Sequence, residues 1–300
     1  MRVAITGASG LIGSALAQAL HERGDEPIPI SRTPKPGTVA IGWDPAQGFE
    51  PPDVLSGCDA VVNLAGESIA GRWTDTKKAK IRDSRLQATK TVVDGIALAN
   101  PRPRVLINAS GIGVFGDRGD ELLDETHEPG DDFLAEVCRA WEAAAREAET
   151  LIGEPVRVCI ARFGMVLDTH GGALPQLLTP FRFGLGGPVG GGRQWVSWVH
   201  RRDAIEALLF LLDNAHATGA YNVVAPNPVR NAELGKTLAA VLHRPAFLPV
   251  PKLGVRLLFG EMGEGLLLAS QRATPKRLQE DGFVFGFPEL RGALDNLLAS

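Results

Sequence analysis

The sequence of 300 residues predicts an α/β fold, in which a doubly wound parallel sheet is joined to a smaller C-terminal α+β domain. Short apolar runs bounded by turn residues recur along the chain, and helix-periodic stretches separate most of them. This alternation is typical of a parallel sheet with helices on both faces, because parallel strands need a crossover connection. The predicted strands are residues 3–5, 28–30, 60–64, 105–107, 156–160 and 221–224.

Apolar periodicity and end signals locate the helices. The first is predicted at residues 14–23 and ends at Gly24, where a left-handed residue is common. Asn231 is predicted to cap a later helix. Residues 253–281 are predicted to be helical, with one apolar face on the core or on a second copy of the chain; a membrane surface is the alternative. Further helices are expected at residues 77–99, 133–151, 203–212 and 231–242.

Six glycines lie between residues 184 and 192, close to Trp195 and Trp198. Glycine at this density predicts a loop with unusual backbone angles. The loop either lies over a bound ligand or forms a plain turn, and the sequence leaves both open.

The composition excludes several classes of protein. A hydrophobic content of 44% excludes disorder as the main state, and 31 basic against 35 acidic residues, without a long run of either sign, give no footprint for nucleic acid. The three cysteines, Cys58, Cys138 and Cys159, lack metal-ligand spacing. No signal-peptide core or membrane-spanning run is found. We therefore expect a soluble cytoplasmic protein without a metal site, a nucleic-acid partner or membrane insertion.

A glycine motif directly follows the first predicted strand and opens the first helix, which is the context of a dinucleotide-binding turn. Gly7 permits the tight turn, Gly10 lets backbone N–H groups approach a diphosphate, and Gly13 lets helix and strand pack closely. The diphosphate is expected at the helix N-terminus, where unpaired N–H groups and the helix dipole favour an anion. A glycine turn without a ligand is the alternative. Cofactor contacts are expected from Gly7, Ser9, Gly10, Leu11, Ile12 and Gly13.

The residues at the end of the second predicted strand select between the nicotinamide dinucleotides. An NAD site would place an acidic residue there, on the ribose 2′-hydroxyl. This chain has Ser31 and Arg32, and a guanidinium is a bidentate partner for a 2′-phosphate. We therefore predict NADP(H) as the cofactor. The alternative is that Arg32 is a solvated surface arginine.

The third predicted strand ends in Asn63, Leu64, Ala65 and Gly66, which are expected to line the adenine and ribose crevice. On this interpretation, residues 1–165 form a Rossmann-type NADP-binding domain, and residues 200–225 return to it. Residues 166–300 mainly form a C-terminal substrate and helical domain.

Several motifs together resemble one branch of a known family. They are residues 6–13, Asn63-Leu64-Ala65-Gly66-Glu67, Ser84-Arg85, Trp141-Glu142, residues 181–188, residues 198–203 and Phe287-Pro288-Glu289-Leu290. The combination resembles the atypical extended short-chain dehydrogenases/reductases that are labelled epimerase-family or nucleoside-diphosphate-sugar epimerase-like proteins. The resemblance covers essentially the whole chain, and it implies a Rossmann domain with NADP(H). It also implies that Arg85 reaches the cofactor and that Val166 lines its nicotinamide end; for Arg85 a surface salt bridge is the alternative.

The pair of residues that ordinary members of this family use for proton transfer is missing. That pair is a tyrosine followed four residues later by a lysine, which lowers the pKa of the phenol. The only tyrosine of this chain is Tyr221, far downstream. Aligning Glu142 with the glutamate that often follows the lysine puts Leu134 and Cys138 at the two positions. Neither residue can perform the original role, because leucine has no titratable proton and a thiol carries no fixed positive charge.

Two other polar residues are candidates for catalysis. Ser110 ends the fourth predicted strand, where the resemblance places a catalytic serine, and its hydroxyl could orient a substrate carbonyl; capping of the next turn is the alternative. His200 could donate a proton or a hydrogen bond to the substrate, and the alternative is a histidine that anchors two domains.

Two functions from different classes remain open. The first is an NADP(H)-binding oxidoreductase or epimerase-like enzyme that acts on an unknown small molecule, held between the carboxyl edge of the sheet and residues 180–200. The second is a non-catalytic NADP(H)-sensing regulatory protein. The fold favours neither, because both occur on it. A homodimer is also left open.

Overall fold

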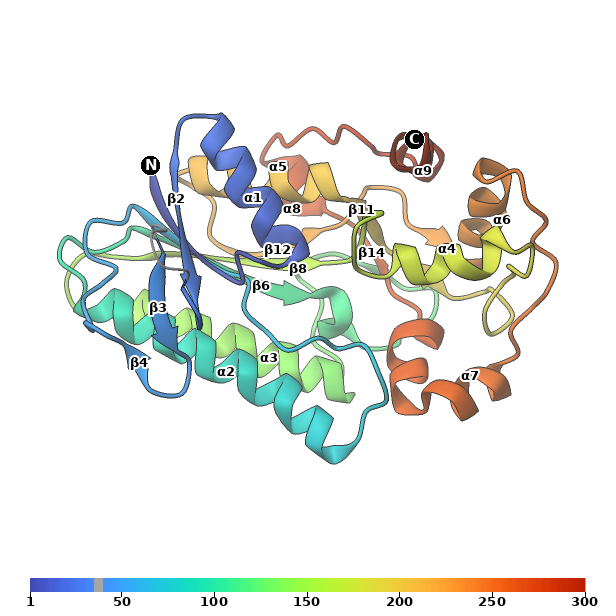
Figure 1. Ribbon diagram of the computed structural model, residues 1–300, viewed down its shortest axis with the longest axis horizontal. Coiled ribbons are helices and arrows are strands. Elements are labelled where there is room, and N and C mark those ends of the chain that lie inside the picture. Colours follow the sequence, from blue (N-terminus) through green and yellow to red (C-terminus); the bar gives the residue numbers. More distant parts are fainter. Residues whose placement is uncertain (35–39, 300) are drawn as a thin grey trace.

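The computed structural model describes residues 1–34 and 40–299, with an eight-stranded sheet at the centre (Figure 1). The strand order is β12-β8-β6-β5-β1-β2-β3-β4, and of these pairs only β3–β4 is antiparallel. The order reverses between β1 and β5, so the predicted doubly wound parallel sheet is confirmed. The strands are β1 (Arg2–Thr6), β2 (Glu26–Ser31), β3 (Ile41–Asp44), β4 (Gly48–Phe49), β5 (Ala60–Asn63), β6 (Val105–Gly111), β8 (Arg157–Phe163) and β12 (Gly219–Val223).

The short edge strands β3 and β4 are absent from the sequence prediction. They are four and two residues long, too short for a clear alternation of apolar and polar residues. The rings of Trp43 and Phe49 stack with centroids 5.7 Å apart. Because β3 and β4 precede it, the strand at residues 60–63 is the fifth strand of the chain, where the sequence predicts the third.

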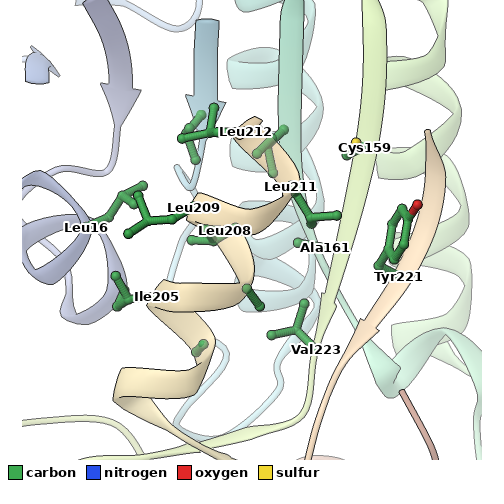
Figure 2. Packing of buried hydrophobic residues seen from close by; sticks show 14 of the residues in the cluster. Leu16, Cys159, Ala161, Ile205, Leu208, Leu209, Leu211, Leu212, Tyr221 and Val223 are labelled. Atoms are coloured by element: carbon green, nitrogen blue, oxygen red, sulfur yellow. The ribbon is translucent and has the colours of Figure 1, made fainter. Parts of the chain in front are cut away.

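Helices cover both faces of the sheet (Figure 1). On one face, α1 (Leu11–Glu22) packs beside α5 (Arg201–Asp213), and on the other α2 (Asp75–Leu98) packs beside α3 (Phe133–Arg146). Figure 2 shows side chains of α5, among them Leu208 and Leu211, packed in the cluster that α1, β8 and β12 complete. Each fully buried leucine stabilises the fold by about 1.5–3 kcal/mol. This layer holds the turn between β1 and α1 rigidly against the sheet.

A third apolar cluster lies in the C-terminal half of the chain, around Leu178, Trp198 and Leu294. Within it, α9 packs against α6, so the end of the chain is part of this cluster. The elements concerned are β9 (Met165–Leu167), α4 (Leu174–Arg182), β10 (Trp195–Val196), β11 (Trp198–His200), β13 (Val229–Arg230), α6 (Asn231–Val241) and α9 (Leu290–Leu298).

The predicted helix at residues 253–281 is wrong. It is replaced by α7 (Lys252–Phe259), the π-helix η3 (Gly263–Leu268), the strand β14 (Arg272–Ala273) and α8 (Lys276–Glu280). Gly260 ends α7 with φ at 58°, a conformation that glycine adopts at little cost. Pro275 precedes α8, and proline disfavours helical geometry in the residue before it. The apolar periodicity of these residues therefore comes from separate short elements.

The predicted capping role of Asn231 is also wrong. The N-cap of α6 is Arg230, which makes no side-chain cap. The side-chain oxygen of Asn231 instead accepts a hydrogen bond from the backbone N–H of Val189 at 2.8 Å. Asn231 thereby fixes the glycine-rich loop. The unusual backbone of this loop is confirmed, since four of its glycines have positive φ: Gly184, Gly190, Gly191 and Gly192.

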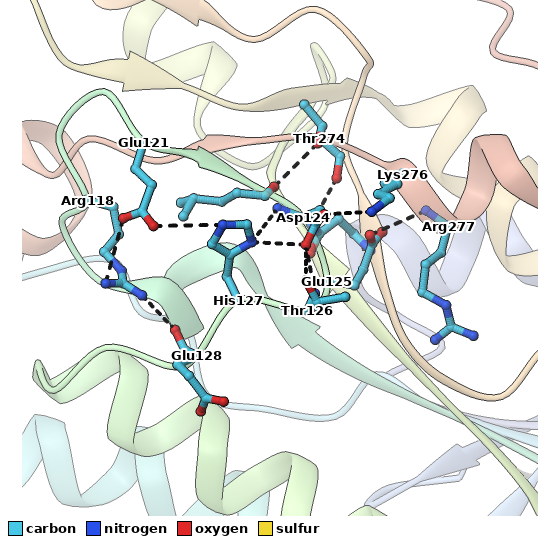
Figure 3. A network of polar contacts seen from close by, with 12 residues as sticks. Arg118, Glu121, Asp124, Glu125, Thr126, His127, Glu128, Thr274, Lys276 and Arg277 are labelled. Carbon is cyan, nitrogen blue, oxygen red and sulfur yellow. Dashed lines mark hydrogen bonds and ion pairs between the residues drawn. The ribbon is translucent and has the colours of Figure 1, made fainter.

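A polar network joins the segment after the short helix η1 (Ile112–Phe115) to the C-terminal part of the chain (Figure 3). Asp124 accepts a hydrogen bond from the Thr126 hydroxyl at 2.5 Å and pairs with Lys276 at 3.1 Å. These donors hold the pKa of Asp124 well below its usual range. Next to it, β7 (Leu122–Leu123) pairs with β14. The contacts fix residues 118–128 against residues 272–277.

Two features are absent from residues 1–34 and 40–299. We find no helix there with the length and hydrophobicity that crossing a bilayer requires. The same residues contain no group of three His, Cys, Asp or Glu side chains placed to hold a metal ion.

Candidate functional site

The turn between β1 and α1 requires glycine at position 7, and the first turn of α1 requires it at position 13. Gly7 has φ at 65°, and a Cβ there would lie 2.8 Å from the carbonyl oxygen of Leu64. A Cβ on Gly13 would overlap the carbonyl oxygen of Gly7 and lie 2.9 Å from the Cα of Ala8. Gly13 therefore packs on the turn itself, whereas the sequence analysis predicts that it lets the helix and the strand pack closely. Gly10 is the N-cap without a side-chain cap, so the first N–H groups of α1 are open to a ligand.

A buried network of hydrogen bonds holds the carboxyl ends of β1, β5 and β6 together. The hydroxyl of Thr6 donates to Asn63 Oδ1 at 2.6 Å and accepts from the N–H groups of Leu64 and Ala65 at 3.0 and 3.1 Å. Asn63 Nδ2 donates to Asn108 Oδ1 at 2.6 Å. Because β1 and β5 flank the point where the strand order reverses, the network fixes the crevice at that edge.

Ser31 and Arg32 lie at the carboxyl end of β2, one strand from the glycine turn. The hydroxyl of Ser31 accepts a hydrogen bond from the N–H of Thr33 at 3.2 Å. Arg32 is exposed and forms no ion pair with the residues that the structure describes. Its charge lowers the pKa of Glu67, after the larger effect of the hydrogen bond from Lys77. The guanidinium of Arg32 is thus on the same edge as residues 63–67.

Arg85 lies on α2 beside Gly66, and a Cβ on Gly66 would be 3.1 Å from its guanidinium carbon. Its Nη1 donates to the carbonyl oxygens of Glu67 and Ile81 at 3.0 and 2.9 Å, and its guanidinium lies 5.0 Å from the ring centroid of Trp141. Burial lowers the pKa of Arg85. Within the described residues it has no carboxylate partner, so the structure does not show the surface salt bridge that the sequence leaves as the alternative.

Val166 lies on β9, and the turn that follows β9 approaches the start of α1. Val166 pairs with Val199 of β11. A Cβ on Gly171 or Gly172 would lie 3.2 or 3.3 Å from the side chain of Leu11. The structure therefore brings residues 166–172 to the same edge as the glycine turn.

Ser110 is not free, because its hydroxyl donates to Glu142 Oε1 on α3 at 2.8 Å. Glu142 also forms a two-point ion pair with Arg162, both contacts at 2.8 Å, and pairs with Arg146 at 3.2 Å. The side chains of Glu142 and Arg162 are 2% and 6% exposed. Burial raises the pKa of Glu142, but the hydrogen bonds and charge of Arg162 outweigh this effect and hold the pKa below its usual value. An ionised Glu142 only accepts hydrogen bonds, so the Ser110 hydroxyl can face a substrate only as an acceptor.

Leu134 and Cys138, which the sequence analysis aligns with the tyrosine and lysine positions, are both buried. Leu134 contacts Gly113 and belongs to an apolar cluster with Trp73 and Met262. Burial, followed by the charge of Glu142, raises the pKa of the Cys138 thiol to about 11. Both side chains therefore carry no charge at neutral pH.

His200 ends β11 and is the N-cap of α5. Its Nδ1 accepts a hydrogen bond from the N–H of Arg202 at 3.0 Å, its Nε2 contacts Asn296 Oδ1 of α9 at 3.2 Å, and its ring stacks on Phe287 with centroids 3.9 Å apart. Burial lowers the pKa of His200. Both ring nitrogens are engaged inside the fold, which is the anchoring arrangement that the sequence leaves as the alternative.

The sequence analysis gives no role to Thr6, Thr89, Asn108, Glu142 or Arg162, which together order the polar interior beside the candidate site. Trp141 Nε1 donates to the Thr89 hydroxyl at 2.8 Å, and Asn63 Nδ2 donates to the same hydroxyl at 2.9 Å. A polar residue at the end of each apolar strand is the signal that could identify Thr6 and Asn108. No such signal exists for Glu142 or Arg162, because their contact joins a helix to a strand 20 residues apart.

Two surface hollows, of about 480 and 690 Å³, lie elsewhere. The smaller adjoins Asp124 and Lys276, and the larger lies between α2 and α3 beside Phe133. Neither is lined by a residue of the glycine turn or by Arg32 or Arg85. The candidate site is therefore the crevice at the sheet edge, and we assign it from the backbone and side-chain geometry there.

Comparison with known proteins places this geometry in a family. Residues 3–224 match the model described as the NAD dependent epimerase/dehydratase family, and residues 250–297 match a domain of unknown function, DUF1731. The chain is 38% identical to the human epimerase family protein SDR39U1 over 100% of both chains. It is 37% identical to the epimerase family protein YfhF of Bacillus subtilis, over 100% of this chain and 98% of YfhF.

Solved structures agree with the sequence comparison. The crystal structure of human SDR39U1 (isoform 2) with NADPH has a TM-score of 0.91 at 38% identity, and the match covers 100% of both chains. A nucleoside-diphosphate sugar epimerase from Corynebacterium glutamicum has a TM-score of 0.82 at 37% identity, over 99% of this chain and 58% of that one. The chain therefore belongs to the NAD dependent epimerase/dehydratase family and, within it, groups with the epimerase family proteins of the SDR39U1 type.

Proposed function

We propose that this protein binds NADP(H) in the crevice between the β1–α1 turn and the ends of β2 and β5. The observation that carries the proposal is the turn itself, where a Cβ on Gly7 or Gly13 would collide with backbone. The N–H groups at the start of α1 would hold the diphosphate. NADPH in the crystal structure of human SDR39U1, at 38% identity, supports the same choice. The diphosphate contacts would come from Gly7, Ser9, Gly10, Leu11, Ile12 and Gly13.

Three further groups would complete the cofactor site. Ser31 and Arg32 would bind the 2′-phosphate, since a guanidinium and a hydroxyl both donate hydrogen bonds to it. Residues 63–66 would line the adenine and ribose. Arg85 would face the phosphates or ribose, because no protein carboxylate neutralises its charge within the described residues. Val166 would lie at the nicotinamide end. Residues 1–165 together with 200–225 would then form the cofactor domain.

We further propose that the bound cofactor supports oxidoreductase or epimerase-like chemistry on a small molecule held near residues 180–200. When bound, NADP(H) supplies hydride transfer. Reduction of a carbonyl also consumes a proton; Leu134 has none to give, and the buried Cys138 thiol, with a pKa of about 11, is a poor donor at neutral pH. Ser110 would accept a hydrogen bond from a substrate hydroxyl and orient it, because its own hydrogen points at Glu142. Water or an unusual group would carry the proton. A catalytic role of His200 stays a prediction.

A non-catalytic NADP(H) sensor is the second candidate, and one observation favours it. The two positions that carry the tyrosine and lysine in ordinary members are occupied by buried, uncharged side chains, Leu134 and Cys138. A protein of this kind would bind the cofactor tightly without turnover and would respond to its occupancy.

Cofactor choice is tested by calorimetric titration with NADPH and NADH. We expect the wild-type protein to prefer NADPH, and Arg32→Ala to lower the ratio of the two affinities by about 10- to 100-fold, the worth of a charge-assisted hydrogen bond. Arg82→Ala is the matched control, because Arg82 is an exposed arginine that pairs only with its neighbour Asp83. An unchanged ratio in Arg32→Ala contradicts the 2′-phosphate assignment, and no binding of either dinucleotide contradicts the proposal as a whole.

Turnover separates the two candidate functions. Purified protein is mixed with NADPH and a panel of aldehydes, quinones and sugars, and NADPH absorbance is followed. Oxidation above the background rate with any member of the panel supports the enzyme. Tight retention of the cofactor with no oxidation across the panel supports the sensor.

A further inference from the structure

Exposed apolar side chains are concentrated on four segments far from the glycine turn in sequence. Among the described residues, fourteen large hydrophobic side chains are exposed, and nine of them lie on residues 183–185, on residues 247–248, on α7 and on η3. We call this set, with the charged residues between them, the α7 surface. Its apolar members are Phe183, Leu185, Phe247, Leu248, Leu253, Leu257, Leu258, Phe259 and Leu266.

Backbone contacts make these segments adjacent. The N–H of Leu248 donates to the carbonyl of Gly186 at 3.2 Å, and the N–H of Val250 donates to that of Pro188 at 2.9 Å. Pro251 is the N-cap of α7 and follows at once. The α7 surface is therefore built from adjoining segments: two parallel loop segments, the helix α7 that continues one of them, and η3, which packs against α7.

The helix α7 contributes little to the core of the chain. Val255 is its only buried residue, whereas Leu253, Leu257 and Leu258 are 67–70% exposed. Lys252 and Arg256 are four residues apart and so lie on one side of the helix, next to the row of Leu253 and Leu257. A contiguous apolar area of this kind on a folded protein marks an interaction site.

The α7 surface is basic, whereas the formal net charge of the whole chain is −4. Residues 180–193 and 242–260 contain no Asp or Glu, and the two acidic residues of the surface, Glu261 and Glu264, form ion pairs with Lys78 and Arg256. Arg256 pairs with Glu264 at 2.6 Å, and Arg182, Arg244 and Lys252 form no ion pair with the described residues. The basic residues of the two segments are Arg182, Arg193, Arg244, Lys252 and Arg256.

We propose that the α7 surface binds the headgroup region of an anionic lipid bilayer, with α7 lying in the plane of the membrane. Leucine and phenylalanine side chains beside unpaired Lys and Arg are the composition of helices that lie at such an interface. A symmetric homodimer through this face fits less well. A twofold axis would bring the basic residues of both copies into one interface, and the acidic residues of this surface, Glu261 and Glu264, already pair with Lys78 and Arg256 within the chain. The proposal concerns attachment to the surface and is independent of cofactor binding.

Co-sedimentation of the full-length protein with large unilamellar vesicles tests the proposal. We expect sedimentation with vesicles of phosphatidylcholine and phosphatidylglycerol, weak sedimentation with phosphatidylcholine alone, and release at high salt. Arg244→Gln with Lys252→Gln should lower the partition coefficient about 25-fold, from about fivefold for each basic residue at the surface. Leu257→Ser with Leu258→Ser should also abolish binding.

Two control variants isolate the α7 surface. Val284→Ser removes an apolar side chain that is 85% exposed elsewhere, and Lys90→Gln removes an exposed cation of α2; both should bind vesicles like the wild type. Circular dichroism of each variant checks folding.

Three outcomes overturn the proposal. The first is no sedimentation with the anionic vesicles at low salt. The second is equal binding to both kinds of vesicle. The third is a dimer in sedimentation velocity that Leu257→Ser with Leu258→Ser dissociates, which would show that a second copy covers this face.

Discussion

Replacing Glu142 by glutamine should destabilise the protein far more than loss of one hydrogen bond would. The glutamine can keep the contact with Ser110, but it leaves the guanidinium of Arg162, 6% exposed, without a counter-charge. Removing one partner of a buried ion pair costs about 3–5 kcal/mol. We therefore expect Glu142→Gln to lower the free energy of unfolding at pH 7 by about that amount.

Two further variants separate the buried pair from its exposed neighbour. Arg146 pairs with the same carboxylate but is 40% exposed, so Arg146→Ala should cost only about 0.3–0.5 kcal/mol. Replacing both Glu142 and Arg162 by methionine should cost less than Glu142→Gln alone, because the double change leaves no buried charge.

Urea denaturation followed by circular dichroism gives these free energies. The dependence on pH supplies an independent check. The folded pKa of Glu142 lies below its ordinary value of 4.5, so its stabilising contribution is complete above that value and is lost as the pH falls through the folded pKa. The wild type should thus lose more stability than Glu142→Gln on acidification. A cost below 1 kcal/mol for Glu142→Gln at pH 7, or one equal to that of Arg146→Ala, would refute the reasoning.

Three other outcomes follow from single residues. Gly13→Ala should lower the unfolding free energy by about 1–3 kcal/mol and weaken NADPH binding, because the added Cβ would overlap the turn. Gly292→Ala in α9 is the control and should stabilise the protein slightly, because a Cβ there meets nothing within 4 Å. Equal changes of both variants in thermal melts would argue against the steric explanation. Cys138, with a buried thiol whose pKa is about 11, should resist iodoacetamide in the native protein at pH 8, as mass spectrometry of digests would show; rapid native labelling would contradict its burial. The folded pKa of His200 lies below its ordinary value of 6.5, so the free energy of unfolding should fall as the pH falls below 6.5. His200→Gln should weaken this dependence of the unfolding free energy on pH. An identical pH dependence in both proteins would contradict a lowered pKa of His200.

The sequence by itself determines six strands of the central sheet and the glycine turn, because these depend on local signals. The apolar runs ending in Thr6, Asn63 and Ser110 each become a strand of the central sheet. Gly7 lies in the turn before α1 and Gly13 packs on that turn from the helix, so a side chain at either position would break the geometry, and a motif of eight residues is enough to identify it. The sequence also places Leu134 and Cys138 at the positions of the usual proton-transfer pair, and this alignment stays a prediction.

Only the tertiary structure decides what surrounds each polar group. The contact of Ser110 with Glu142, and of Glu142 with Arg162, joins a strand end, a helix and a second strand, and no periodicity of the chain encodes it. The helix predicted at residues 253–281 failed for a related reason. An apolar period describes which residues share a face, but not whether the face packs against the core, and α7 buries only Val255. Burial is a property of the whole fold, so the environment of His200, the ionisation of Glu142 and the exposure of α7 could be learned only from the packed chain.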